Sequence, residues 1–89
     1  MSEGKPLPQP VRLHHGAGSV ELLTVEDAVE ALTAHWPEDA RGPRHRDALD
    51  ACLKVLDGHR SAADAQMGVK AAAEEAGFRL ERVSNQPER

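Results

Sequence analysis

Few residues of this chain can carry redox, metal or base-stacking chemistry. The 89 residues include one cysteine, one tryptophan, one phenylalanine and no tyrosine. A single cysteine excludes a disulfide within the chain and leaves no pair of thiolates for a cysteine-based zinc site. The five histidines are scattered, and no two of them lie four residues apart on one expected helix. We therefore predict no metal site and no cofactor.

The chain also lacks a long apolar segment and a strong charge of either sign. No apolar run approaches the roughly 20 residues of a membrane-spanning helix. The first residues have no apolar core of the kind found in secretory signals. The formal net charge is −4, which argues against general affinity for nucleic acid, because such affinity needs a basic footprint. These features predict a soluble, cytoplasmic protein with no membrane partner.

The apolar residues that are present are mainly alanine, leucine and valine. A chain of this length makes one domain and buries only roughly 60% of the surface of its unfolded state. Small side chains bury little area each, so the core is expected to be modest. Contacts between two copies would enlarge it, and we predict a homodimer.

The N-terminal part of the chain predicts a β-hairpin. Residues 1–10 contain three prolines and predict a flexible lead-in, since such a segment cannot keep a helix and has little to bury. Residues 11–14 and 20–22 alternate apolar and polar side chains, as half-buried strands do. The two glycines between these segments are typical of a turn.

Three helices are expected next. Thr24 and Ser61 are each followed three residues later by an aspartate, which is typical of a capped helix N-terminus. Pro37 predicts the end of the first helix near His35. Pro43 is suited to the first turn of the second helix. Alanines line one side of the third helix and allow close approach of a neighbour.

Residues 78–83 alternate again and predict a third strand, followed by a polar tail at residues 84–89. The order β-β-α-α-α-β predicts a single α+β domain over residues 11–83, with a small antiparallel sheet covered by helices on one face. One question left open is whether the last strand pairs with the hairpin or frays. The competing architecture is a three-helix bundle with a loose β-arm.

Several short motifs occur in a distinctive order and spacing. They are Trp36-Pro37, Arg41-Gly42-Pro43, Ala48, Cys52, Leu56, Gly58 and the run from Ala71 to Gly77. Over about residues 11–80 the chain resembles a bacterial family of small proteins labelled domain of unknown function 982. One departure is Val69, where the family is associated with a phenylalanine. The resemblance supports the fold and implies no activity, cofactor or catalytic residue.

Basic residues gather in sequence around the two ends of the second helix. They are Arg41, Arg44, His45, Arg46 and Arg60. The amides of a helix N-terminus attract anions, so this group is the candidate site for a phosphate, a nucleic acid or an acidic partner surface. No aromatic residue is interleaved with these arginines, which disfavours base stacking. The alternative interpretation is a solvated loop whose charges serve solubility.

Two further residues have a structural and a functional interpretation. Trp36 continues the apolar stripe of the first helix and either fills the space between two helices or anchors an interface. Cys52 lies on the apolar side of its helix and away from the N-terminus, so we expect it to pack in the core and not to react.

Function is predicted only as a class. The leading interpretation is a non-catalytic protein-interaction or regulatory accessory module with an unidentified protein partner. The alternative is binding of nucleic acid or a phosphate ligand through Arg41, Arg44, His45, Arg46 and Arg60. No catalytic motif is present, and an enzyme would need a pocket that so small a core leaves little room for.

Overall fold

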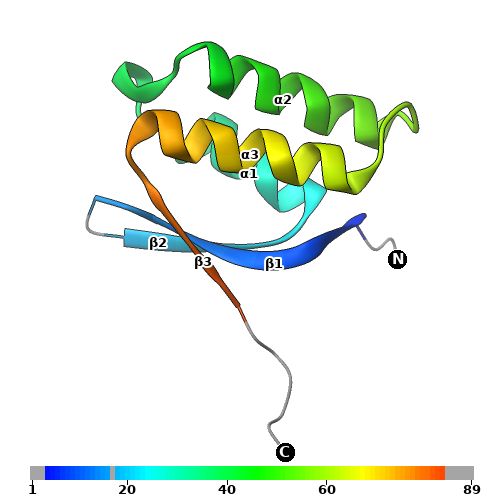
Figure 1. Ribbon diagram of the computed structural model, residues 1–89, viewed down its shortest axis with the longest axis horizontal. Coiled ribbons are helices and arrows are strands. Elements are labelled where there is room, and N and C mark those ends of the chain that lie inside the picture. Colours follow the sequence, from blue (N-terminus) through cyan, green and yellow to red (C-terminus); the bar gives the residue numbers. More distant parts are fainter. Residues whose placement is uncertain (1–3, 17, 84–89) are drawn as a thin grey trace, which may run out of the picture.

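Three helices cover one face of a three-stranded antiparallel sheet in the computed structural model, which describes residues 4–16 and 18–83 (Figure 1). The elements in chain order are β1 (Pro6–His15), β2 (Gly18–Thr24), α1 (Val25–Ala34), a short 3₁₀ helix (Glu38–Ala40), α2 (Pro43–Leu56), α3 (Ala62–Ala76) and β3 (Arg79–Arg82). The predicted α+β fold class and element order are confirmed.

The first strand lies in the middle of the sheet, whose strand order is β2-β1-β3. Leu13 lies opposite Val20 of β2 and opposite Leu80 of β3, and both pairings are antiparallel. The last strand of the described chain therefore joins the hairpin. The alternative of a three-helix bundle with a loose β-arm is wrong.

β1 begins at Pro6, earlier than the start at Val11 that the sequence predicted. Residues 1–10 were expected to form a flexible lead-in, because their prolines cannot keep a helix and they have little to bury. The structure accommodates them with an irregularity, since the register between β1 and β2 shifts between Pro6 and Val11. The remaining parts of the predicted lead-in and tail, residues 1–3 and 84–89, lie outside the described residues.

Contacts from outside the sheet hold this proline-rich part of β1. The backbone amide of Gln9 donates to Oε1 of Gln66 at 2.9 Å, and Nε2 of Gln66 donates back to the carbonyl of Gln9 at 2.6 Å. Leu7 is buried in the core. The amide of Val25, at the start of α1, donates to the carbonyl of Lys5 at 2.7 Å. The segment thus gains order from α1 and α3, which local sequence patterns do not reveal.

The helix ends follow the predicted capping signals. The hydroxyl of Thr24 accepts the amide of Asp27 at 3.1 Å, and the Asp27 carboxylate accepts the amide of Thr24 at 3.1 Å, which forms a capping box. The hydroxyl of Ser61 accepts the amide of Asp64 at 3.3 Å. α3 ends at Gly77, whose φ of 80° is in the left-handed region that glycine adopts readily.

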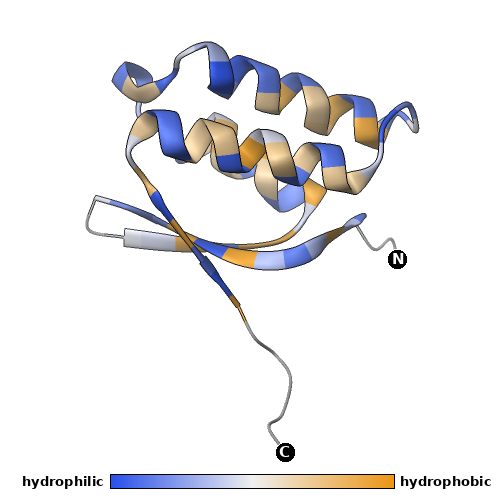
Figure 2. Cartoon of the chain, in the orientation of Figure 1, coloured by the Kyte–Doolittle hydropathy of each residue, from blue (hydrophilic) through white to orange (hydrophobic). Residues whose placement is uncertain are grey.

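The core lies between the sheet and the helices. Hydrophilic residues lie on the solvent-facing sides of α2 and α3 (Figure 2). Its largest fully buried side chains are Leu13, Leu22, Leu32, Val25, Val55 and Cys52. α2 and α3 approach closely at Gly68, where an added Cβ would lie 3.1 Å from Cα of Ala48. Within the described residues no helix has the length and apolar character needed to span a bilayer.

Candidate functional site

The five basic residues named above do not converge on one surface. The side chain of Arg41 makes hydrogen bonds at the C-terminus of α1. Its Nε donates to the carbonyl of Trp36 at 3.1 Å, and its Nη2 donates to the carbonyl of Thr33 at 3.1 Å. A cation at this position satisfies terminal carbonyls and complements the negative end of the helix dipole. Arg41 therefore stabilises the end of α1.

The N-terminus of α2 already has an anion of its own. The backbone amide of Arg44 donates to Oε1 of Glu75, a residue of α3, at 3.1 Å. Gly42 makes room for this carboxylate, because a Cβ on Gly42 would lie 2.6 Å from its Oε2. A carboxylate at this point satisfies an unpaired amide and favours the positive end of the dipole. The site predicted for an external anion is thus capped from within the chain.

Loss of this cap has a measurable consequence. We expect Glu75→Ala to lower the free energy of unfolding by about 1 kcal/mol, since one helix cap and its dipole interaction are lost. Urea denaturation followed by far-UV circular dichroism measures the change. Glu74→Ala is the matched control, because Glu74 is also exposed on α3 and lies at the next position. Equal destabilisation by the two substitutions would contradict the cap.

His45 was predicted to belong to the basic surface, and the structure corrects this. Its side chain is buried, with 7% exposure, and its Nε2 lies 2.7 Å from the carbonyl of Leu32. A carbonyl only accepts, so Nε2 donates in this contact. The ring centroid is 5.6 Å from that of Trp36. His45 therefore joins α2 to α1 and has no surface to offer a ligand.

The remaining arginines are exposed but separated by acidic residues. Arg44 and Arg60 line a groove of about 410 Å³ between α2 and α3, which Asp47, Asp50 and Asp64 line as well. Nε of Arg60 lies 3.4 Å from the Asp64 carboxylate. The groove therefore carries charges of both signs, whereas a polyanion is attracted by a surface that is mainly positive.

Arg46 lines a different surface from Arg44 and Arg60. It borders a hollow of about 380 Å³ beside Arg41, Gly42, Pro43 and Asp47. The five basic residues are thus divided among a helix cap, a buried contact and two separate hollows.

Trp36 fills the space between helices, as one of its two interpretations predicted. It is 3% exposed, its ring is 5.0 Å from Phe78 in an edge-on arrangement, and its Nε1 donates to the carbonyl of Ala40 at 3.3 Å. The alternative, an interface anchor, is wrong for the folded chain because almost no part of the indole is accessible.

Cys52 is a core residue with no accessible surface, and burial raises its pKa to about 11. At pH 8 such a pKa leaves roughly one thiol in a thousand ionised, and the thiolate is the reactive form. We expect Ellman's reagent to label the native protein far more slowly than the protein in urea. Rapid stoichiometric labelling in native buffer would contradict this.

The five histidines are distributed over different surroundings. The rings of His15 and His35 are 6.4 Å apart, and His15 also lies 6.0 Å from Phe78. Within residues 4–16 and 18–83, no three of the histidine, cysteine, aspartate and glutamate side chains converge as metal ligands would.

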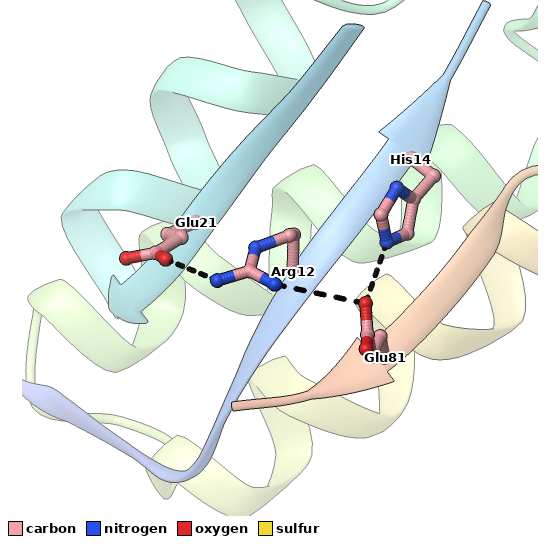
Figure 3. A network of polar contacts seen from close by, with 4 residues as sticks. All are labelled: Arg12, His14, Glu21 and Glu81. Carbon is pink, nitrogen blue, oxygen red and sulfur yellow. Dashed lines mark hydrogen bonds and ion pairs between the residues drawn. The ribbon is translucent and has the colours of Figure 1, made fainter. Parts of the chain in front are cut away.

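A polar network covers the sheet face opposite the helices, and the sequence prediction missed it (Figure 3). Nη2 of Arg12 lies 2.6 Å from the Glu21 carboxylate, and Nη1 lies 3.7 Å from that of Glu81. Nε2 of His14 lies 2.8 Å from Oε1 of Glu81. The alternation of each strand indicated the face, but the partners depend on the strand register, which the sequence does not give.

This network shifts the pKa values of Arg12 and Glu81. The hydrogen bond to Glu21 raises the pKa of Arg12, with help from the nearby charge of Glu81. The hydrogen bond from His14 lowers the pKa of Glu81, and the positive charges of His14, Arg12 and Arg79 add to this. The carboxylates are exposed and Arg12 and His14 are half-buried, so water and salt screen the interactions.

The lowered pKa of Glu81 predicts a direction of pH dependence. Because the folded-state pKa lies below the unfolded one, the contribution of Glu81 to stability is present above the ordinary carboxyl range and is lost as the pH falls through the folded value. Titration of the Glu81 carboxyl by carbon-detected NMR should show the lowered pKa. His14→Gln should move it back upward, whereas a pKa that does not respond would rule out His14 as the main cause.

The fold described above defines a small α+β domain. The sequence profile of a family described as "Protein of unknown function (DUF982)" matches residues 9–80, and the chain belongs to this family. Searches of curated proteins and of solved structures gave no match.

Proposed function

We propose that the chain is a non-catalytic protein-interaction or regulatory module that binds a second copy of itself through the outer edge of β2. The observation that carries this proposal is the contrast between the two edges of the sheet. With the order β2-β1-β3, β2 and β3 each have only one strand neighbour among the described residues. An unpaired edge presents amides and carbonyls that another strand can use.

The two edges differ in how they are protected. β3 has four residues, and three of them are charged, namely Arg79, Glu81 and Arg82. Short, charged edge strands resist pairing. β2 has seven residues, contains neither lysine nor proline, and exposes Leu23 to 42%. Pairing of two β2 strands about a two-fold axis would give one continuous antiparallel sheet.

The alternative of phosphate or nucleic-acid binding at the N-terminus of α2 has less support. Glu75 already bonds the Arg44 amide there, and Asp47 and Asp50 lie beside the arginines. An added phosphate would meet these carboxylates and lose affinity by like-charge repulsion.

The test is the oligomeric state over a range of concentrations, measured by sedimentation velocity. The wild type is expected to dimerise, and Leu23→Lys is expected to weaken the dimer at least tenfold by placing a charge at the paired edge. Leu53→Lys is the matched control, because Leu53 is 47% exposed but lies on α2. A monomeric wild type, or equal weakening by the two variants, would refute the proposal.

A further inference from the structure

A cavity of about 310 Å³ lies between α3 and the sheet, on the side of β3. Its apolar walls are Leu7 and Val11 of β1, Val69 of α3 and Leu80 of β3. Leu7, Val11 and Val69 are buried residues of the core cluster. The cavity therefore extends the core toward the surface, and an apolar occupant would bury the walls further.

The rim of this cavity is polar and carries two positive charges. Lys70 and Arg82 line it, and both are exposed. Within the described part of the chain neither forms an ion pair, whereas Arg12, Lys54 and Arg60 each do. Gln9 and Gln66 also line the cavity, but the Gln66 side-chain amide bonds the backbone of Gln9, and the Gln9 side-chain amide donates to the carbonyl of Pro10 at 3.1 Å. Among the residues that the structure describes, the rim thus offers two cations to an incoming anion and no carboxylate that would repel it.

The combination of an apolar cavity and a cationic rim selects a particular chemistry. A methylene group has a volume of about 30 Å³, similar to that of a water molecule in the liquid. The cavity therefore has room for a chain of roughly eight to ten carbons. The geometry points to a binding site for a medium-chain alkyl carboxylate, with the chain on Leu7, Val11, Val69 and Leu80 and the head group at Lys70 and Arg82. This site is separate from the β2 edge and does not depend on dimerisation.

The probe for this site is sodium decanoate below its micelle concentration, titrated into the full chain and followed by ¹H–¹⁵N NMR. Amides of β1, α3 and β3 around the cavity should shift, while those around Trp36 should not. A buried methylene is worth about fourfold in affinity, so octanoate should bind roughly fifteenfold more tightly than hexanoate, and decanoate roughly fifteenfold more tightly than octanoate. Decanol, which has the chain without the charge, should bind more weakly than decanoate.

Variants separate the two parts of the site. Lys70→Ala and Arg82→Ala should each weaken decanoate by about 1.5- to fivefold, the range expected for the loss of an exposed ion pair. Arg46→Ala is the matched control and should leave the affinity unchanged, because Arg46 lies outside this cavity. Val69→Phe should fill the cavity and abolish binding. Leu80→Trp provides a second block if the first variant does not fold by circular dichroism.

Several results would overturn the proposal. These are no saturable binding, shifts spread evenly over the surface, equal affinity for decanoate and decanol, or an equal loss in Arg46→Ala and Lys70→Ala. Tighter binding of an acetylated peptide ending in leucine would also overturn it, since that would assign the cavity to a protein terminus. A chain-length series that rises through decanoate and falls at longer acids would support the assigned size.

Discussion

Replacement of Trp36 by alanine is expected to lower the free energy of unfolding by about 3–5 kcal/mol, the range measured for large aromatic residues in cores. The indole is 3% exposed, contacts Phe78 and His45, and donates to the carbonyl of Ala40. The substitution removes the contact surface between α1, α2 and the turn before β3. Small domains have about 5–15 kcal/mol of stability in total, so much of the margin would be lost.

Urea denaturation followed by far-UV circular dichroism measures this change, because the variant has no tryptophan to report by fluorescence. Trp36→Phe is the informative companion. It keeps most of the apolar surface but loses the bond to Ala40, and we expect a cost of about 1–2 kcal/mol. If Trp36→Ala unfolded at the same urea concentration as the wild type, the indole would not be the residue that joins these helices.

Leu13→Ala is expected to be as costly, at about 3–5 kcal/mol. Leu13 has no accessible surface and lies in the central strand between Val20 and Leu80. Because β1 is held by a paired strand on each side, we expect the cavity to persist. Thermal unfolding of Leu13→Ala and of the control Leu23→Ala tests this, since Leu23 is 42% exposed on the adjacent strand. The control should change little, and a similar loss in both would contradict the assigned core.

Much of the fold follows from local sequence patterns. Thr24 and Ser61 mark helix starts by their side-chain oxygens, and Gly77 marks a helix end by its freedom at positive φ. These are effects within one turn of the chain, so the sequence contains them in full. The start of β1 is different, because Pro6 pairs with Thr24 beyond a register shift, and its neighbours Lys5 and Gln9 are held by α1 and α3, which are remote in sequence.

The candidate site was harder to predict for the same reason. Basic residues close in sequence indicated a cluster, but the chain directs them to different places. Arg41 bonds the end of α1, and the amide of Arg44 bonds Glu75 from α3. For His45 the sequence contained two indications, because the spacing that places Ala48 and Cys52 inside also places His45 inside, and the structure agrees with this one and not with the basic surface. Glu75 could not, since its partner lies 31 positions away.

The central position of β1 makes one of its flanks depend on β3. β1 is flanked on one side by β2, the next strand along the chain, and on the other by β3, which follows all three helices. Any state of the chain in which β3 is undocked leaves that flank of β1 open to foreign chains. Removal or fraying of β3 would therefore make the chain a seed for aggregation, whereas the docked strand closes that flank.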